Sequence, residues 1–125
     1  MSINNVLGKN RWAFFGWYFG FPQCCIDKFI FDMHNIHGYG VWTRSQEQSD
    51  AASLLDNIGC VPCHSCAVKL INCEMTNDEY LADIQSRRKC NLPFHNRLSC
   101  RGDSHWLRII RRLHSRNELP KNLLE

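Results

Sequence analysis

Eight cysteines in a chain of 125 residues constrain this protein more than any other feature. The apolar runs near the start are interrupted by charges too early for a membrane span, and the aromatic run from Trp12 to Phe21 is not typical of a secretory signal. We therefore expect a cytoplasmic protein that does not enter a membrane. In a reducing compartment, cysteines are more often metal ligands, redox centres or buried apolar side chains than disulfides.

The periodicity of the chain is mostly helical. A hydrophobic fraction of 44% is enough to build a core, and the length suits a single domain over residues 1–125. The capping boxes Ser45-x-x-Gln48 and Thr76-x-x-Glu79 predict two helix starts, whereas strand-like alternation is rare. We expect an all-α bundle of about five helices. The candidate segments number six. They are about 9–19, the stretch from Pro22 to the glycines at 38 and 40, 45–58 up to Gly59, a short stretch through 70–71, 76–89 and 105–115.

The motif Cys63-x-x-Cys66 predicts half of a metal site. Two thiolates at this spacing, on a turn that leads into a helix, can bind one ion while the helix N-terminus stabilises their charge. The best placed further ligands are Cys24 and Cys25 after a Phe-Pro-Gln turn, and Cys90 after a basic run. The predicted site is Zn²⁺ bound by Cys63, Cys66, Cys90 and one of Cys24 or Cys25.

Other interpretations of the cysteines stay open. Cys73 and Cys100 fit buried packing residues, and Cys60 has no assigned role. His64 could replace a cysteine ligand, although it follows Cys63 directly and would more naturally point away. The stretch Cys60-Val-Pro-Cys63-His64 also matches the attachment pattern of c-type haem, which requires export. An iron–sulfur cluster on the four predicted ligands would use the same ligand type and number as zinc.

Three blocks around these cysteines carry a resemblance to known sequences. They are Phe19-Gly-Phe-Pro-Gln-Cys-Cys25, Val61-Pro-Cys-His-Ser-Cys66-Ala67 and Arg88-Lys-Cys90-Asn-Leu-Pro-Phe94. The blocks resemble those of small cysteine-rich proteins of uncharacterised function from phages and bacteria. The resemblance implies a phage-encoded protein in the host cytoplasm, and its blocks coincide with the predicted ligand set.

A second resemblance is to the FAD-linked sulfhydryl oxidases of the Erv/ALR type. The segments that carry it are Trp12 to Pro22, Pro62-Cys63-His-Ser-Cys66-Ala67, and Trp106-Leu107 with Leu113-His114 and Asn117, which look similar in order. This resemblance implies a small helical flavoprotein. Cys63 and Cys66 would then form the disulfide next to FAD, and one thiolate would attack the flavin ring.

Positive charge is concentrated in the last third of the chain. Residues 1–86 carry five Lys and Arg against nine Asp and Glu, whereas residues 87–125 carry ten against three. Within the helix expected there, Trp106, Ile109, Ile110 and Leu113 fall on one face. The opposite face presents arginines, which bind phosphates well. We expect these to contact nucleic acid or an acidic protein surface: Arg108, Arg111, Arg112 and Arg116.

Two further features bear on function. The arginine face could instead be solvated, or could pair with the acidic helix around Asp78, Glu79 and Asp83. The aromatic run could wrap other helices or form an interface. No paired carboxylates, Ser/His/Asp set or Gly-rich phosphate loop occur in the sequence. The predicted function is a zinc-stabilised helical binding module that uses its basic C-terminal helix, and the alternative is a flavin-dependent thiol oxidase.

Overall fold

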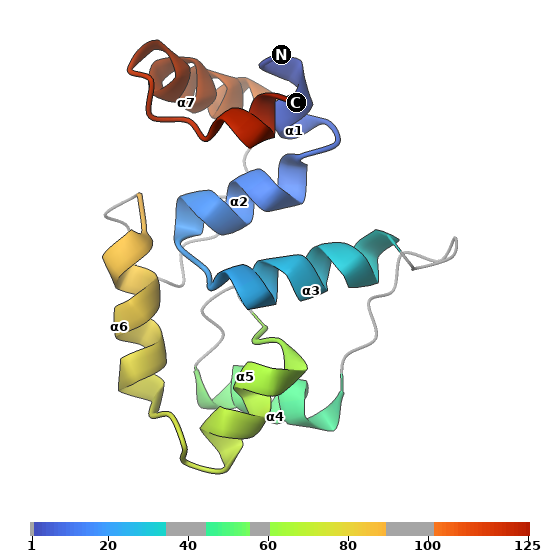
Figure 1. The fold of residues 1–125 in the computed structure, drawn as a ribbon, viewed down its shortest axis with the longest axis vertical. Helices are drawn as coiled ribbons and strands as arrows, with labels where there is room; N and C mark the ends of the chain where they lie inside the picture. Colours follow the sequence, from blue (N-terminus) through green and yellow to red (C-terminus); the bar gives the residue numbers. More distant parts are fainter. Residues whose placement is uncertain (1, 35–44, 56–60, 90–101) are drawn as a thin grey trace. The chain divides into compact units, whose positions relative to one another are not determined.

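The computed structural model describes residues 2–34, 45–55, 61–89 and 102–125 (Figure 1). These residues contain seven α-helices and one 3-10 helix, and none of them forms a strand, so the expected all-α class is confirmed. The elements are α1 (Asn4–Leu7), α2 (Arg11–Phe19), α3 (Gln23–His34), α4 (Gln46–Leu54), α5 (His64–Ile71), α6 (Asn77–Arg87), α7 (Asp103–Ser115) and η2 (Lys121–Leu124). None of the described helices combines the length and apolar content that crossing a bilayer requires.

Both predicted capping boxes are sites of helix initiation. At α4, the Ser45 hydroxyl accepts from the Gln48 amide at 3.2 Å, and the Gln48 side chain accepts from the Ser45 amide at 3.0 Å. At α6, the Thr76 hydroxyl accepts from the Glu79 amide at 3.1 Å. The end expected around 37–40 lies outside the described residues, whereas α4 ends at Leu54 with Leu55 as its C-cap, before the expected end at 58.

The last helix begins at Asp103, two residues before the expected start at 105. Gly102 occupies the N-cap position, and Asp103 is already helical. The Asp103 side chain forms an ion pair with Arg11 at 3.1 Å, so it contributes to tertiary contact and makes no cap. A pattern of capping residues along the chain does not reveal such a distant partner.

The chain is grouped into two compact units. The terminal unit consists of Met1–Phe15 and Arg97–Glu125, and the central unit is Gly16–Asn96. The boundary falls within α2, so this helix contributes residues to both units. That the whole chain forms one domain remains a prediction.

The terminal unit has an aromatic core. The ring centroids of Phe14 and Phe15 lie 6.1 and 5.1 Å from that of Trp106, which is fully buried. Part of the aromatic run therefore packs on the last helix, as one of the two interpretations predicted. Trp12 remains 42% exposed.

Two short elements of the terminal unit were not expected, namely α1 and η2. They lie against each other, and the Ser2 amide donates to the Leu124 carbonyl at 2.9 Å. The Asn10 side chain donates to the Leu123 carbonyl at 2.7 Å. Figure 1 shows the two chain ends side by side here. Elements of four residues carry too little periodicity to predict, because they depend on such distant contacts.

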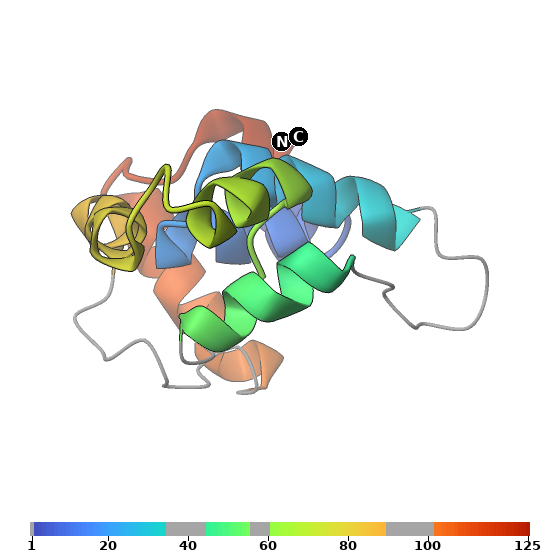
Figure 2. The same ribbon diagram turned by 90° about the horizontal axis from the view of Figure 1, so that it is seen from below.

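The central unit contains α3 to α6. Helices α4 and α5 pack against each other, which Figure 2 shows most clearly. Gly20 ends α2 with a φ of +83°, a left-handed conformation that favours glycine, and its Cα faces the backbone of Ile84 so closely that a side chain there would clash. This turn follows the helix expected over 9–19 and leads into the first pair of cysteines.

Candidate metal centre

Four cysteines from two separate segments meet inside the central unit. The sulfur atoms of Cys24, Cys25, Cys63 and Cys66 all lie within 4.8 Å of one another. Cys24 and Cys25 belong to the first turn of α3, Cys63 is the N-cap residue of α5, and Cys66 lies in the first turn of α5. Two helix N-termini, each with its partial positive charge, therefore point toward one group of sulfurs.

The spacing of the sulfurs fits one tetrahedral ion. Cys24 Sγ lies 3.5 Å from Cys66 Sγ and 4.0 Å from Cys25 Sγ. Four sulfurs at about 2.3 Å from one Zn²⁺ would be separated from each other by about 3.8 Å. The four cysteines are unpaired thiols, so no disulfide occupies the site. Four thiols at these distances could hold a metal ion.

The ligand set differs from the one expected. We predicted that one of Cys24 and Cys25 would join Cys63 and Cys66, but both are present in the cluster. Neighbouring residues on a helix are about 100° apart, which in the first turn still allows both sulfurs to reach one centre. Cys90, the other predicted ligand, lies outside the described residues.

Hydrogen bonds orient the most buried sulfur. The Tyr80 hydroxyl lies 3.2 Å from Cys25 Sγ, and the backbone N–H of Cys63 donates to the same sulfur at 3.3 Å. Tyr80 itself is buried. Partners of this kind fix the direction of a ligand and tune its metal. Tyr80 is a neighbour of the cluster that the sequence did not reveal, because it lies in α6, far along the chain from either cysteine pair.

The thiols differ in their tendency to ionise. Burial raises the pKa of the Cys25 thiol to about 12, and burial together with the charge of Cys25 raises the pKa of Cys66. Burial also acts to raise the pKa of Cys63, but hydrogen bonds from the Cys66 amide and the neighbouring thiols outweigh it, so that pKa is lowered. A divalent cation would stabilise the thiolate form of all four sulfurs at once.

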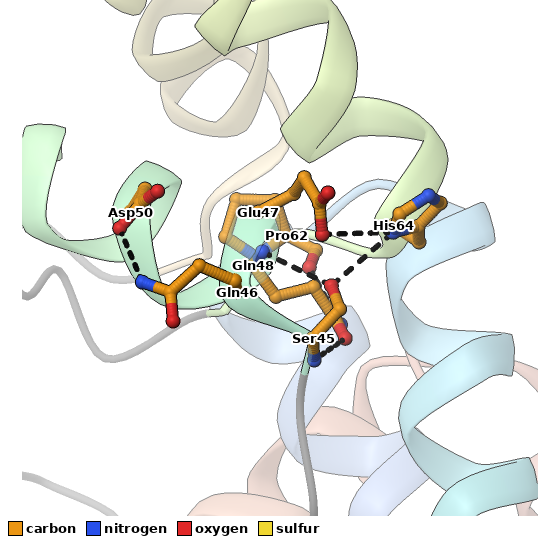
Figure 3. A network of polar contacts seen from close by, with 7 residues as sticks. All are labelled: Ser45, Gln46, Glu47, Gln48, Asp50, Pro62 and His64. Carbon is orange, nitrogen blue, oxygen red and sulfur yellow. Dashed lines mark hydrogen bonds and ion pairs between the residues drawn. The ribbon is translucent and has the colours of Figure 1, made fainter.

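The N-terminus of α4 holds the turn that carries Cys63. The buried side chain of Gln48 donates to the carbonyl of Pro62 at 3.0 Å (Figure 3). On the other side of Cys63, the His64 ring nitrogen Nδ1 lies 3.2 Å from the Ser45 hydroxyl and 4.0 Å from Glu47. His64 is therefore directed toward α4 and does not belong to the cluster, as its position next to Cys63 suggested.

The remaining cysteines do not extend this cluster among the described residues. Cys73 is exposed, so its interpretation as a packing residue was wrong. It follows α5 with a φ of +59°, in the left-handed region. Cys60 and Cys100 lie outside the described residues. The first cysteine of the haem attachment pattern, Cys60, is therefore not described.

The arginine face of α7 is exposed as predicted. Trp106 and Ile110 are buried on the opposite side of the helix. Within the described residues no ion pair involves these arginines, and the acidic side chain of Asp83 pairs with Arg87 of its own helix at 2.6 Å. The exposed arginines are Arg108, Arg111, Arg112 and Arg116.

Comparison with protein-family models, with curated proteins and with solved structures finds no match to this chain. The resemblances stated for the cysteine blocks and for the Trp and Cys-x-x-Cys segments therefore stay expectations. The cysteine cluster and the arginine face are the features from which a function can be inferred.

Proposed function

We propose that this chain is a small helical binding module whose central unit is organised by one structural Zn²⁺ ion. Its ligands are Cys24, Cys25, Cys63 and Cys66. The observation that supports this most is the convergence of four thiols, from segments about forty residues apart in the sequence, within 4.8 Å. Four thiolates complete the coordination of zinc and leave no position for substrate, which favours a structural role over a catalytic one.

A single ion accounts for the cluster better than its rivals. The thiolates of a four-iron cluster bind four different irons, which requires a wider separation of the sulfurs than one shared ion does. A thiol oxidase of the flavin type needs the Cys63 and Cys66 pair, but it gives no role to Cys24 and Cys25 beside them. It remains the alternative proposal, with FAD as cofactor and the disulfide between Cys63 and Cys66 as its redox centre.

The metal proposal is tested on the purified protein. We expect a colourless protein with one zinc per chain by elemental analysis. Replacing Cys63 by Ser should remove the zinc, because a serine hydroxyl is a poor ligand at neutral pH. Replacing the exposed Cys73 by Ser is the matched control and should leave the zinc content unchanged. A yellow protein with flavin absorbance would instead support the oxidase, and a brown one would support an iron–sulfur cluster.

The binding surface that we propose is the arginine face of α7, and its partner is nucleic acid. Its four guanidinium groups are exposed and have no ion-pair partner in the described part of the chain. Such groups bind phosphates bidentately, and the terminal unit as a whole carries nine Lys and Arg against three Asp and Glu. If the partner were instead an acidic protein, its carboxylates would have to match the spacing of these arginines.

Binding to labelled DNA and RNA tests this surface by fluorescence anisotropy at several salt concentrations. The triple change of Arg108, Arg111 and Arg112 to Glu should abolish salt-dependent binding, because each phosphate contact that is lost removes a released counterion. Changing Lys69 to Glu, an exposed position in the central unit, is the matched control. If the triple variant binds as well as the original chain, the arginine face is not the nucleic-acid surface.

A further inference from the structure

One of the four sulfurs is unlike the others in its access to solvent. Cys24 is exposed, whereas Cys25 and Cys63 are buried and Cys66 is half-buried. The first turn of α3 faces outward at Cys24 and inward at Cys25. Small reagents can therefore reach the cluster at Cys24 before they reach its other members.

Cys24 also lacks the hydrogen bonds that Cys25 and Cys63 have. The Tyr80 hydroxyl and the Cys63 amide contact Cys25 Sγ, and the Cys66 amide stabilises Cys63. Among the described residues, Cys24 Sγ contacts the sulfurs of Cys25, Cys63 and Cys66, and no N–H or O–H group donates to Cys24 Sγ or Cys66 Sγ. Each N–H or O–H bond to a thiolate withdraws negative charge from the sulfur, so Cys24 and Cys66 would be the stronger nucleophiles, and of these two only Cys24 is exposed.

We propose that Cys24 is an oxidation site and that Cys66 is its resolving partner, so that peroxide closes a Cys24–Cys66 disulfide and releases the zinc. The inference rests on the proposed function, since it concerns the regulation of the same metal site. The two sulfurs lie 3.5 Å apart, and Cys66 is half-buried whereas Cys25 and Cys63 are buried. A bond between Cys24 and Cys25 would instead require a strained ring between neighbouring residues.

The chemistry balances with hydrogen peroxide as the only oxidant. The Cys24 thiolate attacks one peroxide oxygen, the O–O bond breaks, and the departing hydroxide takes up a proton to form water. The resulting sulfenic acid is attacked at sulfur by the Cys66 thiolate, which forms the S–S bond and expels a second hydroxide. The two thiolates lose two electrons, the peroxide gains them, and two protons are consumed to give two waters. The ion retains only Cys25 and Cys63 as ligands and dissociates.

The positions of trypsin sites in the sequence make the disulfide easy to identify. Cleavage after Arg11, Lys28, Arg44 and Lys69 places Cys24 in peptide 12–28 and Cys66 in peptide 45–69. The proposed disulfide therefore links two peptides. A Cys63–Cys66 disulfide, which the oxidase would use, stays within one peptide. Fragmentation distinguishes Cys24 from Cys25 in the first peptide, and Cys66 from Cys60 and Cys63 in the second.

The experiment adds hydrogen peroxide to the zinc-loaded full chain, records zinc release with a chromogenic chelator, and maps disulfides by non-reducing mass spectrometry. We expect zinc release to accompany the linked peptides 12–28 and 45–69. Replacing Cys24 by Ser should abolish that link and slow zinc release several-fold, and dimedone should label Cys24 in the original chain. Replacing Cys73 by Ser, an exposed cysteine outside the cluster, should change neither result.

Two different failures can be told apart. If the chain holds zinc but peroxide leaves it bound, or releases it with a disulfide inside peptide 45–69, the oxidation site is assigned wrongly while the zinc module stands. If the chain holds no zinc before peroxide is added, the proposed function fails and this inference fails with it.

Discussion

The terminal and central units are stabilised by different means. The terminal unit buries large aromatic rings, with Trp106, Phe14 and Phe15 in direct contact. The core of the central unit is built largely from smaller side chains, and two of its eight buried members are the cysteines Cys25 and Cys63. Smaller side chains each bury less apolar area than large rings do. A bound ion would therefore add to the stability of the central unit and not to that of the terminal unit.

Charge is also distributed differently between the two units. The terminal unit carries nine Lys and Arg against three Asp and Glu, and the central unit carries six against nine. The modest net charge of +3 therefore hides a basic unit and an acidic one. Phosphate binding and metal binding would be separate properties of separate units, and each can be perturbed without the other.

Removing the zinc is the strongest way to test this comparison. A chelator should expose the amides of α3 and α5 to hydrogen exchange, because structural zinc contributes about 10 kcal/mol of apparent binding free energy to the fold around it. The amides of α7 should keep their protection. Mass spectrometry of exchanged peptides provides the measurement, and equal loss of protection in both units would refute the division.

Truncating the aromatic core should destabilise the terminal unit and leave the central unit unchanged. Replacing Trp106 by Ala should destabilise the terminal unit by about 3–5 kcal/mol, the usual cost of removing a buried tryptophan. Zinc content should stay at its original value. The control is Trp12, which is 42% exposed and should cost far less when replaced by Ala. Chemical denaturation followed by far-ultraviolet circular dichroism gives the free energies, and loss of zinc from the Trp106 variant would contradict the prediction.

The contact between α4 and the cysteine turn should have an intermediate effect. Replacing Gln48 by Ala removes the donor to the Pro62 carbonyl and half of the capping box, so we expect a loss of about 1–3 kcal/mol. Gln46, whose side chain bonds to Asp50 on the exposed face, is the matched control. Denaturation of both alanine variants with zinc bound measures the difference. Similar stability of the two variants would show that the buried amide matters little.

The smallest effect is expected at the hydroxyl beside Cys25. Replacing Tyr80 by Phe keeps the buried ring and removes the contact to sulfur, so zinc should bind about tenfold more weakly, at the low end for partners of metal ligands. Competition with a chelator of known affinity measures the change. The fold should be intact by circular dichroism, and an unchanged zinc affinity would mean that the Cys63 amide alone orients this ligand.

Local features of the sequence predicted most of the helices. Capping boxes and glycine or proline stops act within a few residues, so Ser45, Thr76 and Gly20 could be assigned correctly from the sequence. The exposure of the arginine face followed from helical periodicity. In contrast, α1 and η2 depend on contacts between the two ends of the chain, which no local pattern encodes.

The cysteine site was predicted only in part, because local spacing identifies candidate ligands but not how separate helices pack. Spacing and turns pointed to Cys63 and Cys66 as half of a site and to the vicinal pair as a source of ligands. That Cys24 and Cys25 both reach the centre depends on how α3 lies against α5, and Tyr80 and Gln48 act on the site from other helices. Tertiary packing sets these relations, and a single sequence does not report it.

The division of the chain also has a consequence for the order of its synthesis. The terminal unit needs residues from both sides of the central unit, Met1–Phe15 and Arg97–Glu125. On a translating ribosome, all four clustered cysteines emerge before the segment that carries Trp106. The central unit could therefore bind the proposed ion on the nascent chain before Phe14 and Phe15 can contact Trp106. The availability of metal during translation would then affect the earlier folding step.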